Sequence, residues 1–192
     1  MKLSLIRHGA VEGSELGLYY GITDLPITPE SEAELKALAE KGGYPKAERY
    51  FTSGLKRAEQ SFCALYGSIP HGVLPGMREI NLGDFEMRPY EELREDPAFI
   101  SWCTGDIEKN VCPNGESFEQ VTERALEALK PIIEERKDTV IITHGGVIGG
   151  VLARLFPNPD GRFRFSPEPG TGFTAEFDNG VPVKYCKVPA DE

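Results

Sequence analysis

The amino-acid sequence predicts an α/β protein, a three-layer α/β/α sandwich around a mostly parallel central sheet. Short apolar segments of high β propensity alternate along the chain with segments of helical periodicity, which is the pattern of parallel strands joined by helices. Such a sheet is buried on both faces, so helices are expected on either side of it. The chain has 192 residues, of which 40% are hydrophobic, enough for a sizeable core. We therefore expect residues 1–192 to form a single domain.

The predicted strands are short and lie well apart along the chain. Residues 170–188 are expected to form a hairpin around Asn179-Gly180, because this dipeptide adopts the tight turns that join antiparallel strands. The expected strands of the parallel part are residues 2–6 (KLSLI), 47–53 (AERYFTS), 72–76 (GVLPG) and 139–143 (TVIIT).

The predicted helices fill the intervals between these strands. Ser117 and Gln120 fit a capping box at the start of the longest helix, and Pro131 is expected to kink that helix or end it early. The stretch around residues 80–115 is irregular, and we expect it to be a helical insertion that covers the functional site. The segments with helical signals are residues 30–43, 55–67, 89–96, 97–105, 115–136 and 147–156.

Charge and composition exclude several classes of partner. With a formal net charge of −10 and a pI near 4.9, the surface repels nucleic acid and anionic lipid, so neither is an expected partner. No segment approaches the roughly 20 apolar residues of a membrane span. The cysteines, Cys63, Cys103, Cys112 and Cys186, are scattered and lack metal-ligand spacing, so free thiols are expected. We expect a cytoplasmic protein without metal or cofactor, and the sequence does not predict its oligomeric state.

Basic side chains follow three of the predicted strands. Arg7 and His8 come directly after the first strand, His144 follows residues 139–143, and Arg57 lies in the first turn of the helix after the second strand. Ligands of such sheets bind beyond the carboxyl ends of the strands. One histidine in such a place is more often structural than functional, but two His and two Arg together favour a site. His71 lacks a comparable setting and is expected to be a loop residue.

The residue types at these strand ends suit a phosphoryl group. Guanidinium groups bind phosphate oxygens in bidentate fashion, and helix N-termini after residues 9 and 145 would add backbone N–H groups. A neutral imidazole can attack phosphorus and carry the group covalently. The neighbouring Arg charges favour the neutral form of His8, and His144 could stabilise charge on the transferred group.

The reaction also needs a proton donor for the leaving oxygen. Glu79 is the carboxylate that we favour, because it follows a strand-like segment at the start of the irregular stretch. Glu12, Asp84 and Glu86 are weaker candidates. A solvated surface position is the ordinary expectation for any one Glu in a chain with 31 acidic residues.

Five motifs in order make the sequence similar to a known family. They are RHG at residues 7–9, SGLKRAEQS at 53–61, REINLGDFE at 78–86, PNGESFEQV at 113–121 and ITHGGVI at 142–148. Their order resembles that of the histidine phosphatase superfamily, the phosphoglycerate-mutase-like group. The resemblance implies the three-layer fold and a metal-independent phosphohistidine mechanism. It also implies that His8 is the nucleophile and Glu79 the proton donor, that Arg7, Arg57 and His144 form the phosphate pocket, and that Gly145 offers a backbone donor.

The sequence departs from the usual family pattern at several positions. Ala10, Val11 and Ser14 stand where RHGET and a following Asn are common, so a phosphate contact from Ser14 is an open expectation. The basic residue that commonly precedes QG in the family is missing, and Tyr20-Gly21 stands there instead. These changes favour hydrolysis over phosphoglycerate-mutase-type transfer, which remains an alternative.

Within the superfamily, the segments GLYYGITDLPIT and LGDFEM are most similar to α-ribazole phosphatase-type members. The expected substrate is therefore a small-molecule phosphate ester, with α-ribazole 5′-phosphate as a candidate. The aromatic residues Tyr19, Tyr20, Phe85 and Trp102 could form a wall for a nucleoside-like leaving group, or could pack in the core or a lid.

Two further classes of function stay open at the level of sequence. A metallohydrolase could use His8, His144 and Glu79 as a set of two histidines and one carboxylate. Against it, Arg7 and Arg57 would place a divalent cation among fixed positive charges. A non-catalytic phospho-ligand binder would also retain the pocket.

Overall fold

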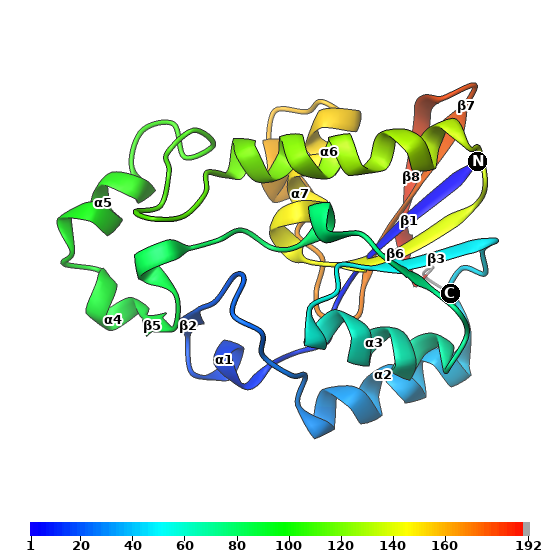
Figure 1. The fold of residues 1–192 in the computed structure, drawn as a ribbon, viewed down its shortest axis with the longest axis horizontal. Coiled ribbons are helices and arrows are strands. Elements are labelled where there is room, and N and C mark those ends of the chain that lie inside the picture. Colours follow the sequence, from blue (N-terminus) through cyan, green and yellow to red (C-terminus); the bar gives the residue numbers. More distant parts are fainter. Residues whose placement is uncertain (190–192) are drawn as a thin grey trace.

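The computed structural model describes residues 1–189 and shows a six-stranded sheet between two layers of helices (Figure 1). The strand order is β4-β3-β6-β1-β7-β8. The pairings among β4, β3, β6 and β1 are parallel. β7 pairs antiparallel with β1 on one side and with β8 on the other. The predicted three-layer α/β/α class is confirmed.

The strands lie close to their expected positions. β1 (Lys2–Arg7) is central and pairs with both β6 and β7. The predicted hairpin turns at Asn179 and Gly180, both at positive φ. The other strands of the main sheet are β3 (Arg49–Thr52), β4 (Gly72–Val73), β6 (Thr139–Thr143), β7 (Gly172–Asp178) and β8 (Val181–Val188).

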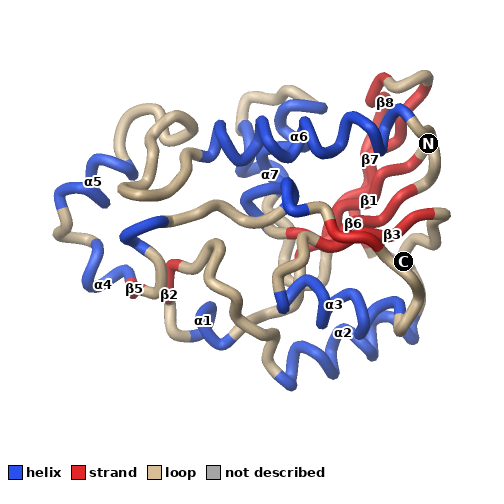
Figure 2. The backbone as a smooth tube through the Cα atoms, in the orientation of Figure 1, coloured by secondary structure: helices blue, strands red, loops and turns tan. Residues whose placement is uncertain are grey.

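Two pairs of long helices cover the sheet, α2 and α3 on one face and α6 and α7 on the other (Figure 2). Strand residues alternate between these layers, so Leu3, Leu5 and Ile141 join the core under α6 and α7, while Ile6 and Val140 join the core under α2 and α3. The helices are α2 (Pro29–Lys41), α3 (Lys56–Tyr66), α6 (Phe118–Glu134) and α7 (Gly145–Leu155).

The longest helix, α6, begins as predicted and ends later than expected. The Ser117 hydroxyl accepts from Gln120 N–H and the Gln120 side chain accepts from Ser117 N–H, which forms the capping box. The helix continues through Pro131 to Glu134, so the predicted early end is wrong. Pro131 lies on the exposed face in the last turn, where water can bind the carbonyl group that loses its N–H partner.

The irregular stretch carries short elements at the end of the molecule away from the β7–β8 hairpin (Figure 1). One of them, β5, pairs with β2 in a separate two-stranded sheet. No helix in the described part of the chain is long and apolar enough to cross a membrane. The remaining elements are α1 (Glu12–Glu15), β2 (Leu18–Tyr19), η1 (Pro75–Met77), η2 (Gly83–Phe85), β5 (Arg88–Pro89), α4 (Tyr90–Leu93), α5 (Pro97–Cys103) and η3 (Gly161–Phe165).

Candidate active site

The carboxyl ends of β1, β3 and β6 bring the predicted basic residues together. Arg7 pairs in register with Thr143, so the residues that follow, His8 and His144, leave the sheet side by side. Their ring centroids are 5.1 Å apart. The helix after β3 begins at Lys56 and places Arg57 in its first turn, as the sequence predicts.

His8 presents an unprotonated nitrogen toward Arg57. Its Nδ1 lies 2.6 Å from the carbonyl oxygen of Gly9, which can only accept, so Nδ1 carries the ring proton. Nε2 accepts a hydrogen bond from Arg57 Nε at 3.2 Å. Burial, with the charges of Arg57 and Arg7, lowers the pKa of His8 to about 3. The ring is therefore neutral at pH 7 and has its lone pair at Nε2.

His144 is oriented by a serine that the sequence did not single out. Its Nε2 lies 2.8 Å from Ser53 Oγ, and burial together with the Arg57 charge lowers the pKa of His144 well below the usual range. The Nδ1 atom is buried and has no hydrogen-bond partner among the described residues. A buried unsatisfied nitrogen is costly, so this atom is a candidate contact for a ligand.

Arg57 is held by a loop on its outer side. Its Nη1 donates to the carbonyl oxygen of Thr23 at 2.8 Å and Nη2 to that of Gly21. The guanidinium carbon lies 5.5 Å from the centroid of the Tyr20 ring. Burial lowers the pKa of Arg57, although Glu79 opposes this effect most among the nearby acids.

Arg7 adds a second unsatisfied donor to the site. Its Nη1 donates to the carbonyl oxygen of Pro167 at 2.9 Å, whereas its buried Nε has no partner within the described residues. A Cβ atom on Gly145, the first residue of α7, would lie 3.6 Å from this Nε. The free Arg7 and His144 nitrogens and the start of α7 together suit an anion with several oxygens.

Glu79 is fixed against the first turn of α7. Its two carboxylate oxygens accept from Gly146 N–H and from Ile80 N–H, each at 3.0 Å. Arg124 of α6 supports the backbone, since its Nη2 donates to the Glu79 carbonyl oxygen at 2.9 Å. Glu79, Gly145 and Gly146 also line a pocket of about 280 Å³. A carboxyl group at the wall of this pocket can exchange protons with a ligand inside it.

Comparison with known proteins decides the family. The sequence profile of the histidine phosphatase superfamily (branch 1) matches residues 3–183. The chain belongs to this superfamily. Together with the phosphatases among its relatives, this makes the protein a histidine phosphatase, an enzyme that hydrolyses phosphate esters through a phosphorylated histidine.

Individual relatives support the assignment. The adenosylcobalamin/α-ribazole phosphatase of Salmonella typhimurium is 32% identical over 165 residues, which cover 83% of this chain and 81% of that protein. The crystal structure of the α-ribazole phosphatase from Shigella flexneri superposes with a TM-score of 0.84 at 25% identity, covering 95% of this chain and 93% of that one. A phosphoglycerate mutase from Thermus thermophilus gives a TM-score of 0.73 at 28% identity, with full coverage of both chains.

Some predicted contributors to the histidine phosphatase site lie elsewhere. The backbone N–H groups after His8 do not face a ligand, because those of Gly9 and Ala10 donate to the hydroxyls of Ser61 and Ser31. The helix expected after residue 9 is the four-residue α1, which is too short to form an N-terminal anion site. The expectation for these groups is therefore wrong.

Ser14 and the weaker acid candidates are also placed by the structure. Ser14 lies exposed on α1, 2.6 Å from the hydroxyl of Tyr20, so a phosphate contact from Ser14 stays a prediction. Glu12 lines a separate groove, and exposed Asp84 accepts from the Asn114 amide. Glu86 binds backbone N–H groups of the loop that holds Arg57.

His71 has a partner that the sequence did not predict. Its Nε2 lies 2.8 Å from Glu59 and its ring packs on Phe62, with centroids 4.1 Å apart. His71 is nevertheless a loop residue directly before β4, as expected.

Residues that orient the phosphatase site carried no chemical signature in the sequence. Ser53, Arg124 and Glu86 act through hydrogen bonds to His144, Glu79 and the Arg57 loop, and such partners depend on three-dimensional placement. Ser53 and Glu86 do lie within two of the family motifs, SGLKRAEQS and REINLGDFE, but the motifs do not indicate these roles. Within residues 1–189, no group of three or more His, Cys, Asp and Glu side chains is arranged to hold a metal ion.

Proposed function

We propose that the enzyme hydrolyses a small-molecule phosphate monoester by forming a phosphohistidine at His8 Nε2. The observation that carries this proposal is the fixed state of the His8 ring. Its proton is held on Nδ1 by Gly9, and its Nε2 lone pair faces the guanidinium of Arg57. This is the state in which an imidazole attacks phosphorus.

In the first step, His8 Nε2 forms a bond to phosphorus as the bond to the ester oxygen breaks. Arg7, Arg57 and His144 bind the phosphoryl oxygens with donors that include the free Arg7 Nε and His144 Nδ1. Glu79 gives its proton to the leaving oxygen, which departs as an alcohol. Gly145, at the start of α7, offers its backbone N–H to the phosphoryl group, and Ser14 is a further contact if Tyr20 releases it.

In the second step, water hydrolyses the phosphohistidine. Glu79, now ionised, takes a proton from the water molecule as its oxygen bonds to phosphorus and the bond to Nε2 breaks. The products are inorganic phosphate, neutral His8 and protonated Glu79, so the enzyme is regenerated. This cycle requires no metal ion or organic cofactor.

The pocket beside Glu79 supports an aromatic leaving group. Its walls include the side chains of Tyr19, Tyr20, Trp102, Phe118 and Phe163. Flat apolar walls favour a ring system, and the names of the relatives point to α-ribazole, a nucleoside. We therefore propose α-ribazole 5′-phosphate as substrate. The segment at residues 80–115 contributes Ile80, Leu82 and Trp102 to the pocket lining, which supports the prediction that it covers this part of the site.

Phe85 does not belong to this wall. It is 1% exposed and packs against Phe99 and Trp102, with ring centroids 5.4 and 5.7 Å away. The alternative reading of this residue as part of the core is the right one.

The same pocket disfavours phosphoglycerate-mutase-type transfer. A bisphosphorylated intermediate needs a cationic contact for its second phosphate. Among the described residues that line the pocket, Arg162 is the one cation. Its Nε and Nη2 donate to the Glu108 carboxylate at 2.5 and 2.7 Å, and its Nη1 donates to the carbonyl oxygen of Gly146 at 3.1 Å. The pocket therefore presents no free charge to a second phosphate.

The test is phosphate release in excess EDTA from p-nitrophenyl phosphate, α-ribazole 5′-phosphate and 3-phosphoglycerate. Wild type is expected to be active and His8→Ala inactive, whereas His71→Ala, a histidine outside the site, retains wild-type activity. Activity that persists in His8→Ala would contradict the mechanism. Loss of activity in EDTA that added metal restores would favour a metallohydrolase. Tight phosphate binding without turnover on any ester would favour a binding protein.

A further inference from the structure

The carboxylate of Glu86 gathers an unusual number of hydrogen-bond donors. The backbone N–H groups of Gly21, Ile22 and Thr23 donate to it at 3.1, 3.0 and 3.3 Å, and Leu82 N–H donates at 3.0 Å. The Thr23 hydroxyl donates as well. Three successive N–H groups of one loop thus converge on a single side chain, as they would on a bound anion.

The opposite side of the same loop holds the phosphate-binding arginine. The carbonyl oxygens of Gly21 and Thr23 accept from the two terminal nitrogens of Arg57. With both terminal nitrogens fixed, the remaining Nε–H of Arg57 points at His8 Nε2, 3.2 Å away. Phosphorus bonds to this nitrogen in the proposed reaction, so the Nε–H lies where a phosphoryl oxygen has to sit.

A glycine makes the close approach of Glu86 possible. A Cβ atom at Gly21 would lie 1.8 Å from the Ile80 carbonyl oxygen and 2.8 Å from Glu86 Oε1. Any side chain here would separate the loop from the segment that carries Glu86. Gly21 is therefore matched to the position of Glu86.

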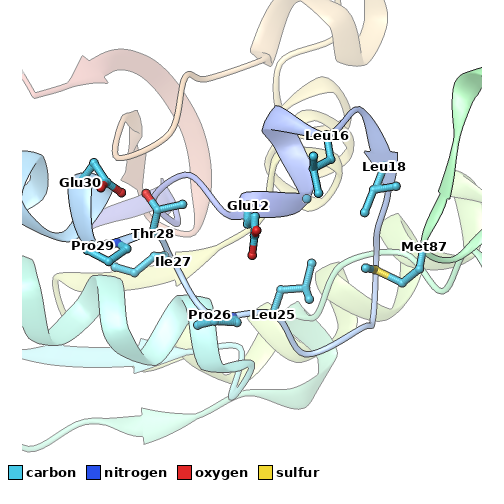
Figure 3. Close-up of a pocket in the computed structure, with 11 residues that line it drawn as sticks. Glu12, Leu16, Leu18, Leu25, Pro26, Ile27, Thr28, Pro29, Glu30 and Met87 are labelled. Atoms are coloured by element: carbon cyan, nitrogen blue, oxygen red, sulfur yellow. The ribbon is translucent and has the colours of Figure 1, made fainter.

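Packing alone does not hold the loop in place. The chain on either side of residues 20–23 curves around a groove of about 490 Å³, lined by Leu18 and Leu25 among others (Figure 3). Met87, the neighbour of Glu86, faces the same groove. Tyr20 packs against the core under α2 and α3, and residues 21–23 are restrained by polar contacts to Glu86 on one side and to Arg57 on the other.

We propose that Glu86 is a positioning residue for phosphoryl transfer. Its carboxylate fixes the loop at residues 21–23, and the loop carbonyls fix the Arg57 guanidinium beside the nucleophile. The inference rests on the proposed role of Arg57 as a phosphate ligand. Glu86 belongs to the irregular stretch at residues 80–115 and lies outside the phosphate pocket, yet it aligns an arginine of that pocket.

The test compares Glu86→Gln with a matched control, Asp84→Asn, which neutralises an exposed carboxylate two residues away. With p-nitrophenyl phosphate, kcat/KM of Glu86→Gln is expected to fall about 30-fold, as misplacement of a binding group by a fraction of an ångström would cause. The inhibition constant for inorganic phosphate is expected to rise in parallel, because product and substrate use the same arginine. Asp84→Asn should match wild type in both quantities.

A milder variant guards against loss of folding in Glu86→Gln. Thr23→Val removes one donor to the carboxylate and leaves Glu86 in place. Its kcat/KM is expected to fall about threefold, the effect of one modest hydrogen bond, again with weaker phosphate inhibition.

The outcomes separate alignment from general stability. A variant that merely lowers the folded fraction would show a lower kcat with unchanged KM and unchanged phosphate inhibition, and that result would overturn the proposal. Kinetics of Glu86→Gln within threefold of wild type would overturn it too. Wild type without phosphatase activity would instead contradict the proposed function, so the two failures are distinguishable.

Discussion

The two imidazoles of the site leave different ring nitrogens free. Gly9 binds Nδ1 of His8 and leaves Nε2 for the reaction, whereas Ser53 binds Nε2 of His144 and leaves Nδ1. The Ser53 oxygen already accepts from Leu55 N–H at 3.3 Å, so the hydroxyl proton is available to His144. We expect Ser53 to donate this proton to Nε2, so that the proton of the neutral His144 ring lies on Nδ1 as a donor toward the phosphoryl group.

Replacement of Ser53 tests this assignment. In Ser53→Ala, the tautomer of His144 is no longer selected, and kcat is expected to fall about tenfold, the equivalent of one hydrogen bond. Nitrogen NMR of the ring should show a proton on Nδ1 in wild type and a mixture of tautomers in the variant. Ser4→Ala removes a buried hydroxyl bonded to Thr174 in the sheet and should leave kcat unchanged. A wild-type ring protonated on Nε2 would refute the assignment.

The residues that could be predicted from sequence are those whose position follows from topology alone. Arg7 ends β1, His8 and His144 directly follow strands, and Arg57 lies in the first turn of the helix after β3. Parallel strands share one carboxyl edge, so the convergence of these residues needs no coordinates. Glu86 shows the limit of this reasoning. Most of its partners are main-chain N–H groups of residues 21–23, more than sixty residues away, and hydrogen bonds to the backbone leave no pattern in residue types.

At the level of elements, the turn between η2 and β5 contains a strained residue. Met87 has a φ of 60°, a left-handed conformation that is costly for a side chain with a Cβ. The turn persists because Met87 N–H donates to the Tyr19 carbonyl oxygen at 2.6 Å, which starts the small β2–β5 sheet.

Substitution of this residue by glycine should relieve the strain. Met87→Gly is expected to raise the free energy of unfolding by about 1 kcal/mol, since glycine adopts positive φ without a steric penalty. Met87→Ala loses the same side chain and keeps the strain, so it should not be stabilised. Urea denaturation of both variants measures the difference. Equal stabilities of the glycine and alanine variants would show that backbone strain at residue 87 is negligible.

Gly146, in the first turn of α7, leaves room for the Glu79 carboxylate because it has no side chain. A Cβ atom on Gly146 would lie 2.4 Å from Glu79 Oε1. Gly146→Ala should therefore displace the proton donor and lower kcat by about 100-fold, although alanine favours the helix itself. At Gly145 a Cβ would meet only Arg7 atoms at ordinary contact distance, so Gly145→Ala should lose far less activity. Steady-state kinetics with an unactivated ester tests both.

Elements with strong local signals could be predicted closely, and those formed by tertiary contacts could not. The capping box at Ser117 and the turn at Asn179 are encoded within a few residues, and both are present. The continuation of α6 past Pro131 depends on which face of the helix meets solvent. The β2–β5 pairing could not be predicted from the sequence either, because each strand has two residues and forms only by pairing with the other.

For the molecule as a whole, the buried histidine pair makes stability depend on pH. The pKa of His8 is lowered to about 3 and that of His144 is also lowered, whereas unfolded chains bind a proton at each histidine near pH 6.5. Below about pH 6.5 the unfolded state therefore binds more protons, and the free energy of unfolding falls as the pH decreases. For His8 this loss continues until the pH approaches 3.

Removal of one imidazole should reduce this acid sensitivity. Each histidine that stays neutral in the folded state contributes a slope of about 1.4 kcal/mol per pH unit below pH 6. The difference in unfolding free energy between pH 6 and pH 5 should thus be about 1.4 kcal/mol smaller in His8→Asn than in wild type. Urea titrations at the two pH values provide the measurement, and identical pH dependence would show that the pKa of His8 is the same in the folded and unfolded protein.

The strand order also determines when the active site comes into existence. β1 carries the nucleophile at its end, yet both strands that flank it, β6 and β7, come from the last third of the chain. On the ribosome, His8 therefore emerges before either of these strands and waits in an unpaired segment until they are made. His144 emerges with β6, the first of the two strands that pair with β1. A nascent or truncated chain that lacks β6 contains the reactive histidine without its phosphate pocket, so phosphoryl transfer switches on only when assembly of the central sheet is complete.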